Sequence, residues 1–139
     1  MLVSFIAYFL LLYTFGLGYR TELQLFNVVI QLFFIYRSIR AYYASDPENT
    51  RSYMLGVVQG MRTSAIGVGG FAFFMIIFLA LNPTLMSAIS QNSQVGAYLN
   101  PFTATIVILA EGLVVGLIGS YIFTRISEDE PITKEDKIT

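Results

Sequence analysis

One carboxylate stands inside a long run of apolar residues. Residues 105–121 read TIVILAEGLVVGLIGSY, and Glu111 is the charged residue among them. In the middle of a membrane helix, a charged side chain costs on the order of 3 kcal/mol or more unless it is paired or hydrated. Glu111 can bind a proton or a cation there, or it can stay neutral and hydrogen-bond a neighbouring helix or a bound partner. Both interpretations place it against protein or a cavity.

A stripe of polar residues supplies candidate partners for this carboxyl. Its members are Gln24, Asn27, Gln31 and Ser38. Their separations of 3, 4 and 7 residues place them on one face of a helix. The stripe should face inward, where it forms interhelical hydrogen bonds or lines a path for a substrate. Gln59 and Arg62, in the next apolar segment, complete the possible ion site, although Arg62 can instead extend to lipid headgroups.

Several kinds of chemistry are excluded by residues that the chain lacks. It has no cysteine and no histidine, so thiol nucleophiles, imidazole bases and His/Cys zinc sites are ruled out. One carboxylate without a second reactive group offers catalysis little, so we expect no enzyme, no cofactor and no metal. Basic residues are not interleaved with aromatics on one face, so we expect no nucleic-acid partner.

The composition is that of a membrane protein. Hydrophobic residues make up 55% of the 139 residues and charged residues 12%. Soluble domains carry about 25% charged residues. The mean hydropathy of +0.67 points the same way. We therefore expect membrane lipids around the chain, which is long enough for one membrane domain.

Four segments approach the roughly 20 apolar residues that a helix needs to cross a bilayer. They are residues 2–17, 23–42, 47–81 (with a start outside the membrane) and 102–124. They predict an all-α, polytopic membrane protein, an antiparallel bundle of four transmembrane helices over residues 1–126. Thr21 with Gln24, and Asn100 with Pro101, have the spacing of helix starts. Residues 127–139 contain five acids and two lysines and predict a flexible, cytoplasmic tail.

The positions of the basic residues predict the orientation. Residues 82–100 carry no charge, and the first connection, residues 18–22, holds Arg20 as its one basic residue. The second connection and the tail are more basic and hold Arg37, Arg40, Arg51, Arg125, Lys134 and Lys137. Because basic loops stay cytoplasmic, both termini are expected on the cytoplasmic side of a bacterial inner membrane. In the uncharged connection, Leu85, Met86 and Ile89 have helical spacing and predict a short helix in the outer interface.

Small residues recur at four-residue spacing in the last two segments. The helix-packing candidates are Gly56, Gly60 and Ser64 in the third segment, and Gly112 and Gly116 in the fourth. This spacing lets helix backbones approach closely, within one bundle or between protomers.

The run FIYRSIRAYYASDPENTRSYMLGVVQGMRTSAIGV at residues 34–68 has an I-R-x-Y element, a polar loop and a glycine-spaced helix start. An NPF turn at residues 100–102 and the run GLVVGLIGSYIF follow later. Over about two thirds of the chain, this pattern resembles a family of small four-span bacterial membrane proteins, frequent in Bacteroidota and catalogued as a domain of unknown function. The resemblance implies an inner-membrane protein without assigned catalytic residues, in a lipid-linked sugar context.

Three functions are compatible with these features. The first is a non-enzymatic accessory or scaffold subunit, packed against other membrane subunits or itself through glycine faces and buried polar contacts. The second is a small oligomeric transporter or channel that couples to protons or cations through Glu111. The third is a membrane anchor for a polyprenyl-phosphate glycosyltransferase or another lipid-handling enzyme, with the acidic tail as a docking segment.

Overall fold

The computed structural model describes residues 1–18, 20–45, 52–92, 96–131 and 134. These residues form five α-helices, one short 3₁₀ helix and no strand, which confirms the all-α prediction. The elements are α1 (Leu2–Thr14), α2 (Thr21–Ser45), α3 (Tyr53–Leu81), α4 (Pro83–Asn92), η1 (Gly96–Tyr98) and α5 (Pro101–Asp129).

Local capping determines several of the helix ends. Asn100 and Thr103 form a reciprocal capping box at the start of α5, with Thr103 N–H donating to Asn100 Oδ1 and Asn100 N–H to Thr103 Oγ1, both at 2.8 Å. The predicted helix start at Asn100 is therefore confirmed. Asn82 caps the end of α3, and its Nδ2 donates to the carbonyl of Phe78. The side chains of Thr21 and Gln24 lie outside the described part of the chain.

The helix bounds differ from the sequence prediction at several ends. Helix α1 stops at Thr14 rather than at residue 17, because the chain turns through Gly16, whose φ of 70° suits a residue without a Cβ. Helix α5 continues to Asp129, past the predicted end at residue 124. Helix α3 begins at Tyr53, and the predicted start at residue 47 lies outside the described residues.

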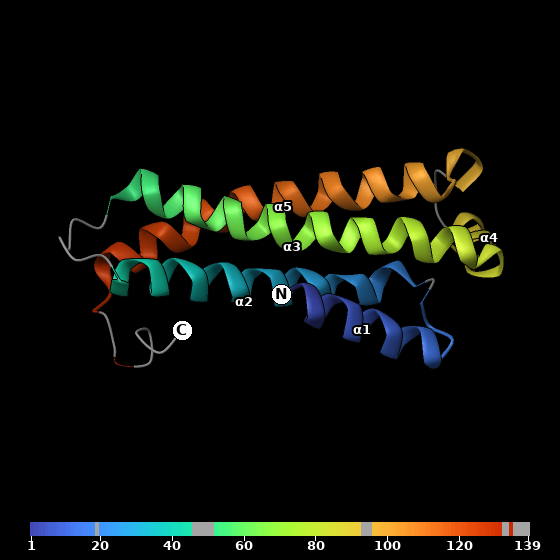
Figure 1. The fold of residues 1–139 in the computed structure, drawn as a ribbon, viewed down its shortest axis with the longest axis horizontal. Coiled ribbons are helices and arrows are strands. Elements are labelled where there is room, and N and C mark those ends of the chain that lie inside the picture. Colours follow the sequence, from blue (N-terminus) through green and yellow to red (C-terminus); the bar gives the residue numbers. More distant parts are fainter. Residues whose placement is uncertain (19, 46–51, 93–95, 132–133, 135–139) are drawn as a thin grey trace.

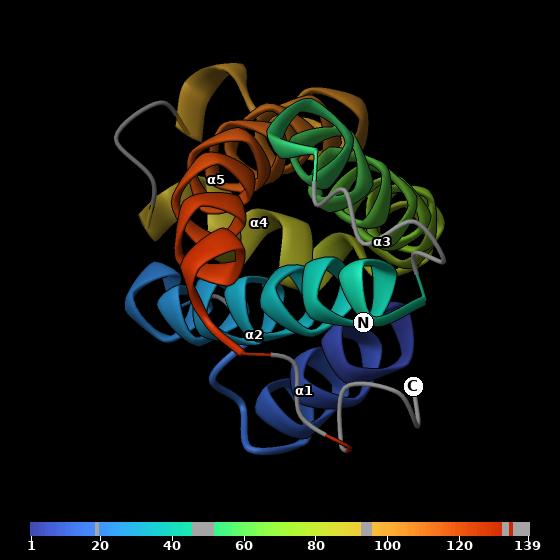
Figure 2. The same cartoon turned by 90° about the vertical axis from the view of Figure 1, so that its left-hand side faces the viewer.

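The helices run alongside one another in an elongated molecule (Figure 1). Helices α2, α3 and α5 contact one another, and α1 packs on α2 and α3. Figure 2, which looks along the molecule, shows α1 outside α2 and α4 at the far end. Because α1 is short, it covers only part of the length of α2 and α3.

Contacts of the first two residues of the chain show where α1 begins relative to α3. An added Cβ at Gly67, in the middle of α3, would meet the Met1 side chain, and one at Gly70 would meet Leu2. The helix has 13 residues, which corresponds to about 20 Å, so it runs from the middle of α3 towards α4 (Figure 1).

Close contact between α3 and α5 passes through small residues. An added Cβ at Gly60 would meet Ser120, and one at Gly116 would meet Ser64. An added Cβ at Gly112 would meet Val68. The four-residue spacing noted in the sequence is thus used within the chain, where it lets two long helices lie close together.

Apolar packing is concentrated where α1, α3 and α4 meet. Phe9 contacts the rings of Phe71, Phe74 and Phe78, with ring centroids 6.3, 6.1 and 5.2 Å away. From α4, Leu85 and Met86 are buried in the same cluster. The short helix predicted around these residues is thus present as α4, and its apolar side packs on the rest of the chain.

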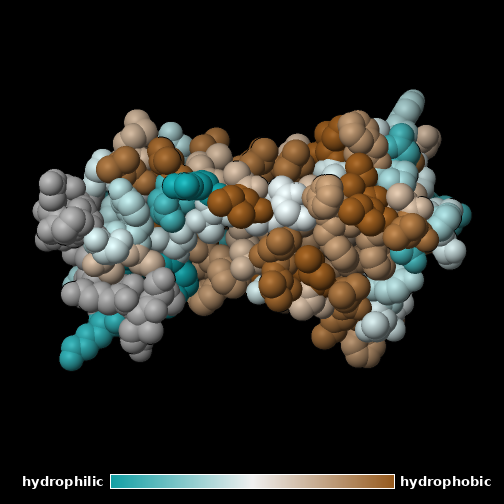
Figure 3. Space-filling model, in the orientation of Figure 1, coloured by the Kyte–Doolittle hydropathy of each residue, from teal (hydrophilic) through white to brown (hydrophobic). Residues whose placement is uncertain are grey.

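Two helices, α3 and α5, are long and apolar enough to cross a membrane. Each has 29 residues, or about 44 Å, against a hydrocarbon core of about 30 Å. Figure 3 shows apolar side chains over the middle and the α1 side of the molecule, with hydrophilic residues towards both ends. The chain is therefore a helical protein with two possible membrane spans, and the four-span arrangement stays a prediction.

Candidate functional site

A small cavity lies where α1, α2, α3 and α5 come together. Its volume is about 90 Å³, enough for several water molecules. Most of the wall is apolar and includes Phe5, Phe9, Phe71 and Met75. Three polar residues also line it, namely Asn27, Gln31 and Glu111. The structure thus brings together three of the residues predicted to form a polar site.

Gln31 joins three helices at this cavity. Its side chain is 3% exposed, and its Nε2 donates to Ser64 Oγ of α3 at 2.8 Å and to the carbonyl of Gly112 in α5 at 2.7 Å. Both N–H groups are therefore used, whereas no described residue donates to its Oε1. The interhelical role expected for the amide stripe is seen here for Gln31.

Asn27 lies one helical turn before Gln31 and is bonded differently. Its Oδ1 is buried, and no described residue donates a hydrogen bond to it. A buried acceptor without a partner costs about 1–3 kcal/mol, so such an atom commonly marks a site for water or an ion. On the α2 side of the cavity, the amide oxygens of Asn27 and Gln31 therefore accept no hydrogen bond from any described residue.

Glu111 reaches the cavity from α5 but is not enclosed by this chain. It is exposed, and no described residue forms a hydrogen bond or ion pair with it. The expectation that Glu111 bonds a neighbouring helix or a bound partner therefore stays a prediction, with no such contact from the described residues. The reason is geometric: α5 turns Gly112 and Gly116 towards α3, which leaves the preceding residue at the edge of the contact.

Gln59 and Arg62 do not belong to this cavity. Gln59 Nε2 donates to Ser38 Oγ at 2.9 Å, and the hydroxyls of Ser38 and Thr63 share a hydrogen bond of 2.6 Å. Arg62 is exposed on α3. The predicted stripe therefore splits into two polar groups along α2, while the side chain of Gln24 lies outside the described part.

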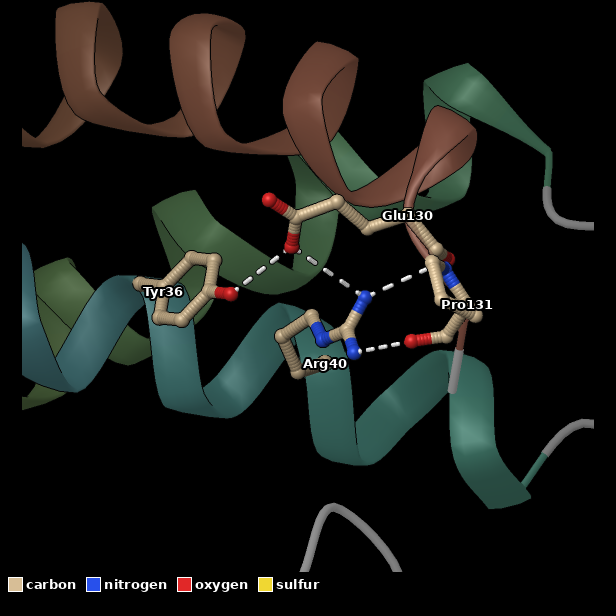
Figure 4. A network of polar contacts seen from close by, with 4 residues as sticks. All are labelled: Tyr36, Arg40, Glu130 and Pro131. Carbon is tan, nitrogen blue, oxygen red and sulfur yellow. Dashed lines mark hydrogen bonds and ion pairs between the residues drawn. The ribbon is translucent and has the colours of Figure 1, made fainter. Parts of the chain in front are cut away.

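A further polar network was missed in the sequence, and Figure 4 shows it. Arg40 of α2, 4% exposed, lies 3.5 Å from the Glu130 carboxylate and donates to the carbonyl of Pro131 at 2.6 Å. Tyr36, one turn earlier, donates to Glu130 Oε2 at 2.9 Å. Glu130 was assigned to a flexible tail, whereas the structure holds it against α2. The four-residue spacing of Tyr36 and Arg40, facing an acidic run, was the available signal.

The cavity has the donor set of a site for a proton, water or a monovalent cation. Carboxylate and amide oxygens suit hard cations. Among the described residues, no three acidic side chains gather to hold a divalent metal. Comparison with known protein families, with curated proteins and with solved structures finds no match for this chain. The resemblance to the four-span bacterial family stays a prediction.

Proposed function

We propose that this chain is a non-enzymatic accessory subunit of a bacterial inner-membrane assembly, and that the exposed face of α5 around Glu111 contacts its partner. The observation that carries the proposal is an exposed carboxyl, without a partner among the described residues, in the middle of an apolar helix. In lipid, such a group is costly unless another chain covers it.

The surroundings of Glu111 support a helix as the contacting element. Val107, Val114 and Ile118 lie one or two turns away on the same side of α5, and all three are exposed. In the most apolar stretch of α5 17% of the residues are buried, against 39% in α3. An apolar transmembrane helix with one polar side chain facing Glu111 would match this surface.

The charges support a placement in the membrane. Four arginines lie towards the end of the molecule where α2 and α5 finish, namely Arg37, Arg40, Arg62 and Arg125 (Figure 1). Arg20 lies at the other end. We place the arginine-rich end, with the end of α5, in the cytoplasm. A cytoplasmic N-terminus would need α1, which has 13 residues, to cross the membrane, and it stays a prediction.

Site-specific crosslinking in native membranes tests the interface. A photoreactive residue replaces Val114, and the same residue at exposed Ile66 of α3 is the matched control. We expect Val114 to capture one discrete partner protein and Ile66 to capture lipid. Glu111→Leu should lower the captured and co-purified partner at least tenfold, while Glu111→Gln should keep it, because an amide still hydrogen-bonds.

Two results would contradict the accessory role. One is the absence of any protein product at Val114. The other is an assembly that Glu111→Leu leaves intact. The melting temperature of the isolated Glu111→Leu variant should equal that of the parent chain, so a loss of partner cannot be attributed to unfolding.

The cavity favours a second function, a small oligomeric transporter or channel coupled to protons or cations. Asn27, Gln31 and Glu111 line one space, which the accessory role alone does not require. In proteoliposomes, an imposed sodium or pH gradient should then drive flux that Glu111→Gln abolishes. Flux that is absent under both gradients excludes this function, and a second copy as the Val114 crosslinking product favours it.

A further inference from the structure

The cavity between α1, α2, α3 and α5 offers oxygen atoms that lack hydrogen-bond donors. Both N–H groups of Gln31 are used, on Ser64 and on Gly112, so Oε1 is the polar atom of its amide that remains. Asn27 Oδ1 is buried and accepts no hydrogen bond from any described residue. The ionised carboxylate of Glu111 contributes acceptors only. These three side chains therefore suit a ligand that several oxygen atoms can approach at once.

Helix geometry brings the three side chains to nearly the same level of the bundle. Helices α2 and α5 run in the same direction (Figure 1), and Gln31 of α2 bonds the carbonyl of Gly112 in α5. Asn27 lies one turn before Gln31. On α5, Ile108 lies one turn before Gly112 and lines the same cavity. Because side chains lean towards the N-terminus of their helix, Glu111 leans towards the level of Asn27.

The charge at the cavity matches a single positive charge. Glu111 is the one charged side chain among the described residues that line it. A monovalent cation neutralises this carboxylate, whereas a divalent ion would leave a positive charge in apolar surroundings. Phe5, Phe71 and Met75 form part of the apolar wall. Such a wall lowers the local dielectric constant and so strengthens the attraction between a carboxylate and a cation.

A metal cation satisfies more of these oxygen atoms than a proton or a water molecule does. A proton bound to Glu111 gives the carboxyl one O–H group to donate, and one water molecule donates to two acceptors at most. A metal cation is coordinated by all three side chains together, and carboxylate and amide oxygens are ligands for hard cations. The volume of about 90 Å³ leaves room for water as a further ligand.

We propose that this cavity binds a monovalent metal cation such as sodium, coordinated by the side-chain oxygens of Asn27, Gln31 and Glu111 and by water. The ion compensates the charge of Glu111, which is otherwise costly in lipid. The inference rests on the second function proposed above and deepens it, because it names the ion to which a transporter of this kind would couple.

Thermal unfolding of the purified chain in detergent tests the site. The melting temperature is measured in sodium chloride and in choline chloride of equal ionic strength, because choline is a bulky cation without metal character. We expect sodium to raise the melting temperature of the parent chain by about 3 °C or more. Glu111→Gln and Asn27→Leu should each lose this increase. Glu22→Gln, which removes the same charge from an exposed residue in the first turn of α2, should keep it.

Equilibrium binding of radiolabelled sodium to the same samples measures the site directly. We expect one saturable sodium ion per chain. The dissociation constant should rise about tenfold or more in Glu111→Gln and in Asn27→Leu, and it should stay at the parent value in Glu22→Gln. The two cavity variants lie on different helices, so one of them still reports on the site if the other fails to fold.

Three outcomes would overturn the cation site. The first is a parent chain that sodium does not stabilise and that binds no saturable sodium. The second is an equal effect of sodium on Glu111→Gln and Glu22→Gln, which places the ion elsewhere. The third is stability that depends on pH through Glu111 but not on sodium, which indicates a proton.

The isolated chain in detergent needs neither flux nor a partner for these measurements. Saturable sodium binding without flux in proteoliposomes would exclude the transporter and support the cation site. Crosslinking at Val114 reports on the partner at α5 alone. Failure of the cation site and failure of either proposed function are therefore distinguishable.

Discussion

Gln31 in α2 donates a hydrogen bond from Nε2 to the main-chain carbonyl of Gly112 in α5, at 2.7 Å. Residues 81 positions apart are thereby joined next to Glu111. The same nitrogen also donates to Ser64 of α3, so one amide connects three helices at the cavity. The stability of this part of the fold should therefore depend on Gln31 more than on any exposed amide.

Replacement of Gln31 by leucine should lower the stability of the chain. Two buried interhelical hydrogen bonds are lost, each worth about 0.6–1 kcal/mol in membrane proteins, so we expect a decrease of about 1–2 kcal/mol. Thermal unfolding in detergent measures it. Gln91→Leu on α4 is the control, because Gln91 is exposed. Equal melting temperatures for the two variants would show that the bonds of Gln31 contribute nothing.

Replacement of Asn27 by leucine should instead raise the stability of the chain. Its buried Oδ1 lacks a partner among the described residues, so an apolar side chain removes an unsatisfied acceptor and fills part of the cavity. We expect stability to rise by about 1 kcal/mol in the absence of sodium. If the parent chain is stabilised by sodium and Asn27→Leu loses that effect, the cavity is a cation site.

Alanine substitutions at two glycines within helices should change the stability of the chain in opposite directions. At Gly116 an added Cβ would lie 2.6 Å from Ser64 Cβ, so Gly116→Ala should separate α3 from α5 and cost about 1–3 kcal/mol. At Gly69 nothing lies within 4 Å, so Gly69→Ala should stabilise α3 by about 0.5–1 kcal/mol. Melting temperatures that fall equally in both variants would contradict the close α3–α5 contact.

Arg40 should hold the end of α5 against α2. Arg40→Gln removes a buried cation that contacts Glu130 and two main-chain carbonyls, and we expect a loss of about 3 kcal/mol. Cleavage by protease after Asp129 should also accelerate. Arg125→Gln is the matched control, since its ion pair with Glu128 is exposed, and it should change stability by less than about 0.5 kcal/mol. Similar cleavage rates in both variants would exclude the anchoring role.

Local features of the fold could be predicted from the sequence. The all-α class follows from long apolar segments, the start of α5 from Asn100 and Pro101, and the end of α3 from Asn82. Each of these signals depends on residues within about one helical turn of one another, so neighbouring residues in the chain contain the necessary information.

The tertiary structure decided which polar residues meet. Asn27 and Gln31 line a cavity with Glu111. Gln59 was predicted to belong to the same site, but it donates a hydrogen bond to Ser38 and does not line this cavity. Exposure of Glu111 and burial of Arg40 depend on how α2, α3 and α5 lie against one another. Periodicity places a residue on a face of its helix, but which neighbour covers that face depends on packing between segments far apart in the chain.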